Sequence, residues 1–118
     1  MRVCKTFYFD AAHRLPSYEG KCKNLHGHRW ELQCELEGTA DPRTGFVVDF
    51  VHLKQVVTGR VIDNLDHCYL NEILLNPTCE NLLCQIYVWL NPVLNISTSR
   101  ISRLRLYETP DSYAEEVF

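Results

Sequence analysis

The chain has 118 residues, 46% of them hydrophobic and 23% charged, with a formal net charge of −3 at pH 7. This length suits one domain covering residues 1–118, and the composition excludes a disordered, collagen-like or low-complexity chain. The acidic balance, without a basic stripe, argues against a general nucleic-acid-binding protein. No apolar run approaches the roughly 20 residues of a membrane span, and MRVCKTFYFD is unlike a signal peptide. We therefore expect a cytoplasmic protein.

Two strands are predicted in the first third of the chain. RVCKTFYF (2–9) is rich in β-forming residues and is ended by DAAH. WELQCELE (30–37) alternates between apolar and polar residues, which is typical of an antiparallel strand with one buried face. Extended backward with the same period, the buried face also carries His28 and His26.

Two helices are predicted to follow. The first is expected from Asp49, a plausible N-cap, to about Asn64, with a shared apolar face made of Phe50, Leu53, Val57 and Val61. The second is expected to begin at Asn76-Pro77-Thr78 and to stop at Asn91-Pro92. Its inward residues are expected to be Leu82, Leu83, Ile86 and Leu90.

Two further strands close the chain. RISRLRLYE (100–108) places Glu108 on the same side as Leu104 and Leu106, and a short strand is expected around YAEEVF (113–118). The order ββααββ predicts an α+β fold with a four-stranded, mainly antiparallel sheet and two helices on one face. A small open sheet has exposed edges, and this favours assembly into an oligomer.

Three histidines are candidates for a metal site. His26 and His28 leave one side of an extended segment, and Gly27 between them permits tight backbone geometry. His13 lies at the end of the first strand, where hairpin pairing would bring it near the other two. Three imidazoles with one vacant position form the open arrangement of a catalytic zinc site. The alternative is three polar surface histidines.

Cys22 lies four positions before His26 and has two possible roles. As a fourth ligand it would close the zinc site and make it structural. As a free thiolate beside a metal ion and Lys21 or Lys23, it would be a base or a nucleophile. The spacing does not decide between them. The other five cysteines show no CxxC pair, so we expect reduced thiols, most of them buried, and no disulfide scaffold.

Asp66, His67 and Glu108 are further candidates for a functional site. Asp66 and His67 lie in LDHCYLNE, in the loop after the first helix, and they form a carboxylate–imidazole pair only if the chain turns there. Otherwise they are a histidine at a helix end and an exposed acid.

Glu108 lies on the inward face of an apolar strand, which costs roughly several kcal/mol unless the carboxylate has a partner. A ligand donor or a buried arginine would supply one.

Six segments resemble, in order and spacing, the 6-pyruvoyl-tetrahydropterin synthase superfamily: FDAAHRL, CKNLHGH, GFVVDF, LDHCYLN, NPTCENL and LYETP. The resemblance covers nearly the whole chain. Within the superfamily the sequence is most similar to the bacterial 6-carboxy-5,6,7,8-tetrahydropterin synthases of the queuosine pathway, because three residues separate Cys22 from His26.

The resemblance implies three groups of site residues. The zinc ligands would be His13, His26 and His28. The catalytic residues would be Cys22 as the proton acceptor, Asp66 and His67 as a pair that assists proton transfer, and Glu108. The pterin ring would be held by Glu108, Thr78 and Glu80. Cations for a triphosphate are not implied; Arg14, Lys21 and Lys23 are the nearest in the sequence.

The resemblance also implies an assembly and a reaction. The fold would be the tunnelling fold, in which the sheets of a trimer close into a barrel, two trimers stack into a hexamer, and active sites lie at subunit interfaces. The implied reaction converts 7,8-dihydroneopterin triphosphate into 6-carboxy-5,6,7,8-tetrahydropterin, acetaldehyde and triphosphate. The alternatives are a pyruvoyl-type synthase, which eliminates triphosphate and keeps every side-chain carbon, and a non-enzymatic module around a structural zinc ion.

Overall fold

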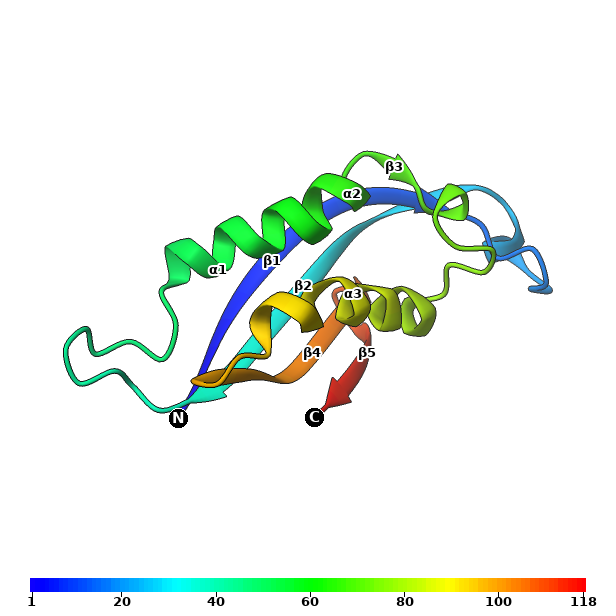
Figure 1. The fold of residues 1–118 in the computed structure, drawn as a ribbon. Helices are drawn as coiled ribbons and strands as arrows, with labels where there is room; N and C mark the ends of the chain where they lie inside the picture. Colours follow the sequence, from blue (N-terminus) through cyan, green and yellow to red (C-terminus); the bar gives the residue numbers. More distant parts are fainter.

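One sheet organises the structure, a computed structural model that describes residues 1–118 (Figure 1). Its strand order is β3-β1-β2-β4-β5. The four longer strands pair antiparallel, and they are β1 (Arg2–His13), β2 (His26–Gly38), β4 (Ser99–Thr109) and β5 (Ser112–Val117). The predicted α+β class and the four antiparallel strands are therefore confirmed.

A fifth strand makes the sheet mixed, so the predicted number of four was wrong. β3 (Cys68–Tyr69) pairs in parallel with Ala11 and Ala12 at the outer edge of β1. A two-residue strand has no alternating pattern to detect in a sequence, and it forms here because the preceding turn is bound to β1. Short 3₁₀ turns, η1 (Lys21–Lys23) and η3 (Leu70–Glu72), occur in the loops.

The first helix is one continuous helical segment with a wide turn in its middle. It comprises α1 (Phe50–Val57), the π-helical turn η2 (Thr58–Ile62) and α2 (Asp63–Leu65). Its buried residues are four apart, namely Leu53, Val57, Val61 and Leu65. In a regular α-helix this spacing would rotate the face by about 40° at each step, and the wider π turn absorbs the excess.

The start of this helix tests the prediction made from the sequence. Asp49 is the N-cap, and its side chain accepts a hydrogen bond of 2.8 Å from the backbone N–H of Val51. Phe50, however, is 48% exposed, so the prediction that it belongs to the buried face was wrong. At 100° per residue it lies about 20° from Val57 around the helix, but it is the first residue of α1, and burial begins only at Leu53.

The second helix, α3 (Cys79–Leu94), begins as predicted and ends later. The Thr78 hydroxyl caps it by accepting from the N–H of Asn81. The four residues expected to face inward are all buried: Leu82, Leu83, Ile86 and Leu90. The predicted stop at Asn91-Pro92 was wrong, because a proline so close to the C-terminus removes few helical hydrogen bonds and buried Leu94 holds the last turn on the core.

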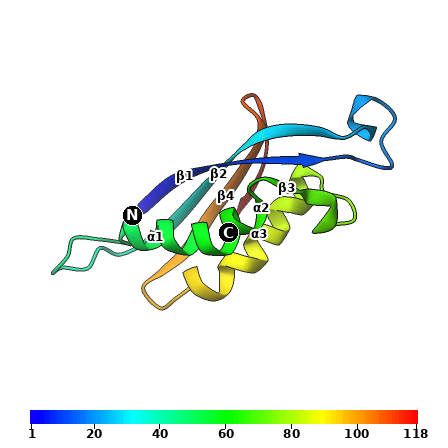
Figure 2. The same ribbon diagram turned by 90° about the horizontal axis from the view of Figure 1, so that it is seen from above.

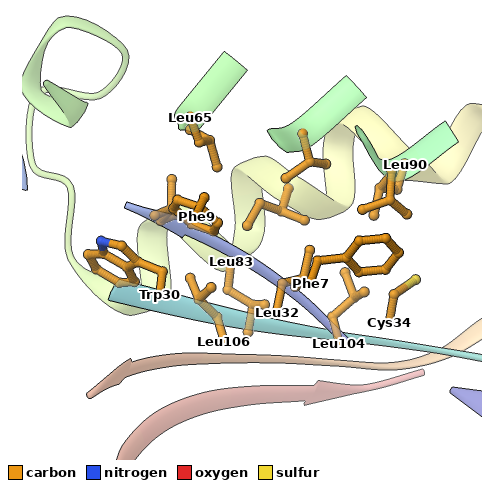
Figure 3. Close-up of a cluster of buried hydrophobic side chains, with 14 of the residues drawn as sticks. Phe7, Phe9, Trp30, Leu32, Cys34, Leu65, Leu83, Leu90, Leu104 and Leu106 are labelled. Atoms are coloured by element: carbon orange, nitrogen blue, oxygen red, sulfur yellow. The ribbon is translucent and has the colours of Figure 1, made fainter. Parts of the chain in front are cut away.

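The core lies between the helices and one face of the sheet (Figure 3). From β2 it receives Trp30, Leu32 and Cys34, all fully buried, and from β4 it receives Leu104 and Leu106. Beyond the helices, the β1–β2 hairpin continues outward in both views, and the molecule is elongated, 54 × 23 × 23 Å (Figures 1 and 2). This projecting end carries the HGH segment.

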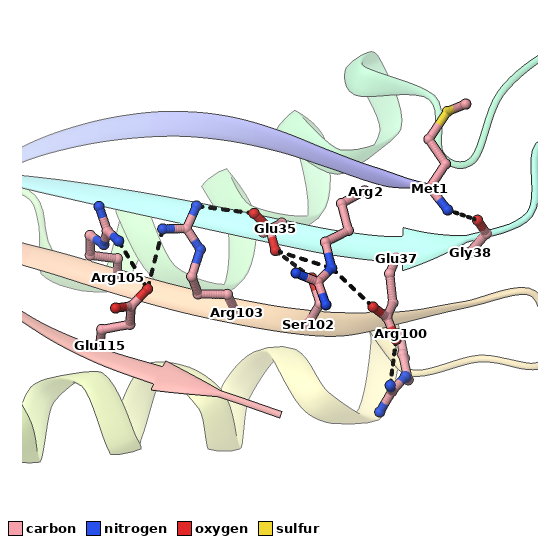
Figure 4. A network of polar contacts seen from close by, with 10 residues as sticks. All are labelled: Met1, Arg2, Glu35, Glu37, Gly38, Arg100, Ser102, Arg103, Arg105 and Glu115. Carbon is pink, nitrogen blue, oxygen red and sulfur yellow. Dashed lines mark hydrogen bonds and ion pairs between the residues drawn. The ribbon is translucent and has the colours of Figure 1, made fainter.

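The opposite face of the sheet is polar and bears no helix (Figure 4). Glu35 faces Arg103 across β2 and β4, with an ion pair of 3.0 Å, and Glu37 likewise pairs with Arg100. Opposite charges at facing positions favour this register of the two strands. None of the helices combines the length and apolar character needed to cross a membrane.

All six cysteines have free thiols, in agreement with the expectation of no disulfide. Only Cys34 and Cys79 are buried, so the expectation that most would be buried was wrong. Burial raises the pKa of Cys34 to about 12 and that of Cys79 to about 11, which keeps both thiols protonated.

Candidate metal centre

The register of the β1–β2 hairpin brings three histidines together. His13 faces His26, and His28 faces Ala11 two residues along, so all three rings leave the inner face of the hairpin. The Nε2 atoms of His13 and His26 are 3.0 Å apart. The centroid of the His28 ring lies 5.2 Å from that of the His13 ring and 4.8 Å from that of the His26 ring. His13 is fully buried, which excludes the alternative of three surface histidines.

Hydrogen bonds to carbonyl groups fix the orientation of two of these rings. The Nδ1 atom of His13 lies 2.8 Å from the carbonyl oxygen of Pro77, and that of His26 lies 2.8 Å from the carbonyl oxygen of Asn24. A carbonyl oxygen only accepts, so each Nδ1 is the donor, and in the neutral ring each Nε2 then carries the lone pair. Two lone pairs that face each other at 3.0 Å repel, and a cation bound between them relieves this repulsion.

Two irregularities in β4 direct Glu108 toward these rings. The register of β2 against β4 shifts at Glu35/Leu36, so the inward positions of β4 change from odd-numbered Ile101 to even-numbered Leu104, Leu106 and Glu108. A second shift, in β4 against β5, leaves Glu108 as the extra residue between Tyr107 and Thr109. These shifts explain why a carboxylate stands at the end of an apolar row.

Glu108 meets two imidazoles there and no lysine or arginine side chain. Its Oε1 atom lies 3.2 Å from Nε2 of His28 and 3.8 Å from Nε2 of His13. The contact with His28 lacks the geometry of a hydrogen bond, so this buried Nε2 atom has no hydrogen-bond partner. Burial lowers the pKa of His28, while the Glu108 carboxylate acts in the opposite direction.

The donor set fits a tetrahedral metal ion. One atom from each of His13, His26, His28 and Glu108 lies within 4.8 Å of the others. Two ligands bound about 2.1 Å from a tetrahedral zinc ion are about 3.4 Å apart. The separations of 3.0, 3.2 and 3.8 Å lie around this value. Three imidazoles and a carboxylate suit zinc and several other divalent ions.

Cys22 does not belong to this group of donors. It is half-buried in η1, where its carbonyl oxygen accepts a 2.8 Å hydrogen bond from the N–H of Leu15 and so closes the loop between β1 and β2. Of the two roles that the spacing left open, this arrangement favours the thiol that is not a ligand. Arg14, Lys21 and Lys23 are exposed at the same end of the molecule.

Asp66 and His67 form the pair that required a turn. Nδ1 of His67 lies 2.9 Å from Oδ2 of Asp66, and the φ of His67 is +59°, a conformation that is uncommon for residues other than glycine. Two contacts with β1 impose it: the Asp10 N–H donates to Oδ1 of Asp66, and the Asp10 carbonyl accepts from the His67 N–H. The bond from Asp10, followed by that from His67, lowers the pKa of Asp66.

His67 stands apart from the four donors within one chain. Its side chain is 80% exposed, and it lines a cavity of about 610 Å³ at the edge of β1 together with Gly27 and His28. The structure thus brings together the three histidines and Glu108, and leaves Cys22 and the Asp66–His67 pair outside that cluster.

Two cavities meet at Glu108. One, of about 520 Å³, opens where β2 and β4 part beyond their last pair, Glu31 and Tyr107, and both His28 and Glu108 line it. The other, of about 150 Å³, lies between α3 and β5 and has Glu80 in its wall. The hydroxyl of Thr78 caps α3, and Thr78 lines neither of these two cavities.

Sequence reasoning missed the groups that orient the histidines. The carbonyl groups of Asn24 and Pro77 carry no side-chain signal, because any residue supplies a carbonyl. It also missed Tyr113 and Ser112, which line the smaller cavity from β5. Their position on the edge strand could have been anticipated only with the register of β5 against β4.

Comparison with known proteins gives matches along the whole chain. Residues 2–117 match the family described as 6-pyruvoyl tetrahydropterin synthase. The 6-carboxy-5,6,7,8-tetrahydropterin synthase of Haemophilus influenzae is 31% identical over 139 residues, covering 97% of this chain and 96% of the relative. The dihydroneopterin monophosphate aldolase of Pyrococcus furiosus is 39% identical over 110 residues, covering 91% and 89%. The structure of Caenorhabditis elegans 6-pyruvoyl tetrahydropterin synthase aligns with a TM-score of 0.88 at 26% identity, covering 100% and 95%.

Proposed function

The chain belongs to the 6-pyruvoyl tetrahydropterin synthase family, and we propose that it is a zinc-dependent enzyme that converts 7,8-dihydroneopterin triphosphate into 6-carboxy-5,6,7,8-tetrahydropterin, acetaldehyde and triphosphate. The observation that carries the proposal is the convergence of three imidazoles, those of His13, His26 and His28, beside a cavity large enough for a small molecule. Several relatives, including that of Haemophilus influenzae, are named for this product. The product would serve queuosine biosynthesis.

The three histidines would be the zinc ligands. A bound zinc ion would polarise oxygen atoms of the substrate side chain and make adjacent protons easier to remove. The buried ring of His13 and the two carbonyl contacts described above hold the ligand atoms in place before a metal arrives.

Proton transfer is assigned to Cys22 and to the Asp66–His67 pair. Cys22 would accept a proton from the substrate, since it is near the metal site in sequence but is not one of the converging donors. Asp66 holds Nδ1–H of His67, so Nε2 of His67 is the nitrogen available to give or take a proton.

The pterin ring would be held by Glu108, Glu80 and Thr78. A carboxylate accepts two hydrogen bonds side by side, and the edge of a pterin ring presents two N–H donors in that spacing. Glu108 has no arginine or lysine partner, so its carboxylate is available to such donors. Glu80 lines the smaller of the two cavities that Glu108 borders.

The active site would be completed by a second copy of the chain. The exposed Asp66–His67 pair lies outside the histidine cluster of its own chain, and β3 and β5 form two open sheet edges. We therefore place the site at the interface of a trimer or a hexamer, with the open sheets joined into a barrel.

A second candidate is aldol cleavage of dihydroneopterin monophosphate, which the 39% identity to the Pyrococcus furiosus aldolase supports. A third is a pyruvoyl-type synthase, named for the structural relative from Caenorhabditis elegans. The spacing of three residues between Cys22 and His26 favours the carboxy product over the pyruvoyl product.

Product analysis distinguishes the three reactions. The zinc-loaded protein is incubated with 7,8-dihydroneopterin triphosphate, and in parallel with the monophosphate, and acetaldehyde, triphosphate and pterins are quantified. We expect equal amounts of acetaldehyde and 6-carboxytetrahydropterin from the triphosphate. Triphosphate release without acetaldehyde would support the pyruvoyl reaction, and cleavage of the monophosphate alone would support the aldolase. Absence of any turnover would contradict the enzymatic proposal.

A further inference from the structure

The environment of Glu108 is unusual for a carboxylate that only binds a substrate. Within ion-pair distance it has two imidazoles and no lysine or arginine. Its Oε1 atom is as close to His28 Nε2 as neighbouring ligand atoms are in a four-coordinate site, and three-quarters of its side chain is covered. An ion bound among the histidines would give this carboxylate a positively charged partner that no lysine or arginine of the chain supplies.

Glu108 also has room to leave this position. It lines the cavity of about 520 Å³ with His28, and it lines the pocket of about 150 Å³ with Glu80 and Tyr113. As the extra residue of a bulge, it has neighbours on β4, Tyr107 and Thr109, that keep the strand paired with β5 on both sides. The side chain can therefore turn while the backbone stays in place.

We propose that Glu108 is an exchangeable fourth ligand, whose Oε1 atom binds the metal held by the three histidines while no pterin is present and leaves it to accept hydrogen bonds from a pterin ring. This rests on the metal site and on the pterin-binding role proposed above. The carboxylate and the substrate oxygens would then compete for one position on the metal. Ring recognition would free that position, so a molecule without the pterin edge would meet a metal ion whose four positions are filled.

The test measures metal binding and ligand field in the protein without substrate. Cobalt(II) replaces zinc as a probe because its visible absorption reports the number and kind of ligands, and its affinity is measured by competition with a chelator. Glu108→Gln should weaken cobalt binding about 10-fold or more, because a carboxamide is a poorer ligand than a carboxylate. The matched control is Glu31→Gln, since Glu31 lines the same cavity without joining the donor group, and its cobalt affinity should equal that of the parent.

A second arm adds unsubstituted pterin, which has the ring N–H donors but no side-chain oxygens. In the parent protein we expect pterin to change the cobalt spectrum toward that of Glu108→Gln without pterin. Glu108→Asp keeps the charge but shortens the side chain, so it should also bind cobalt more weakly, and it provides a folded comparison if Glu108→Gln is unstable.

The outcomes separate this inference from the proposed metal site. If the Glu108 variants bind cobalt like the parent while His26→Ala loses it, the exchange is wrong and the histidine site stands. If His26→Ala also binds cobalt normally, the metal site itself is wrong. A parent spectrum that pterin leaves unchanged, with pterin bound by calorimetry, would overturn the exchange as well.

Discussion

Asp66 accepts a hydrogen bond of 2.9 Å from the backbone N–H of Asp10, and this bond connects the turn after the first helix to the strand that ends at His13. The same strand therefore positions the proposed proton-transfer pair, through Asp10, and a proposed metal ligand, His13, three residues further along. Because the bond uses backbone of β1, it restrains the turn without depending on any side chain of that strand. The left-handed conformation of His67 is maintained by the same contacts.

This bond predicts a pH dependence of stability. The folded protein lowers the pKa of Asp66, so the ionised carboxylate stabilises the fold above its unfolded pKa of about 3.9, and this contribution is lost as the pH falls through the folded value. In urea unfolding of the metal-free protein between pH 6 and pH 3, Asp66→Asn should lose less stability on acidification than the parent. Asp63→Asn, an exposed acid on the same helix, should follow the parent. Parallel curves for Asp66→Asn and the parent would contradict the assignment.

A second prediction concerns metal content. His26→Ala removes one of two rings whose Nε2 atoms face each other, and it should lose most of the bound zinc because the remaining imidazoles compete poorly with water and chelators. Position 26 is preferable to buried His13, where truncation would also open a cavity. Zinc is measured by atomic absorption after dialysis. His52→Ala is the control, because His52 is exposed on α1, and this variant should keep the full zinc content. Full zinc in His26→Ala would remove it from the ligand set.

The thiol of Cys22 provides a third test. Cys22→Ala should reduce turnover at least about 100-fold, the usual contribution of a general acid or base, while zinc content stays unchanged. Cys84→Ala removes an exposed thiol on α3 and should retain activity. Loss of zinc together with activity in Cys22→Ala would instead support a sulfur ligand and a closed site.

Much of this arrangement follows from local sequence patterns, and the rest depends on pairing between distant segments. Alternation along β2 predicted that His26 and His28 share the buried side, and the hairpin register agrees. Parity along β4 likewise predicted an inward Glu108. Its approach to His28 was not predictable, because it depends on two register shifts and on the point where β2 and β4 separate.

The errors have the same origin. Phe50 fits the helical stripe of Leu53 and Val57, but it is the first residue of α1, and its ring remains 48% exposed there. Helix α3 passes Pro92 because packing of its last turn outweighs one missing hydrogen bond. In each case the extent of tertiary packing, and not the local pattern, decides the outcome.

A fourth prediction uses a close approach of backbone atoms at the end of β2. A Cβ atom on Gly38 would lie 2.5 Å from the carbonyl oxygen of Thr98 and 3.2 Å from Cγ1 of Val47. The carbonyl belongs to the chain entering β4, so it cannot move without disturbing the pairing of Gly38 with Ser99. Gly38→Ala should therefore lower the free energy of unfolding by roughly 1–3 kcal/mol, measured by urea denaturation. An unchanged midpoint would show that the turn between α3 and β4 adapts.

The matched substitution is Gly59→Ala, in the π turn of the first helical segment, and it should have the opposite sign. Gly59 is exposed, a Cβ atom there would meet nothing within 4 Å, and its φ is not in the left-handed region. Alanine has a smaller entropy cost than glycine in a helix, so Gly59→Ala should raise the free energy of unfolding by about 0.5–1 kcal/mol. The added methyl group is the same as in Gly38→Ala, so the difference between the two variants isolates the surroundings of each site. If Gly59→Ala were destabilising, the π turn would require the backbone freedom of glycine, and the prediction would be wrong.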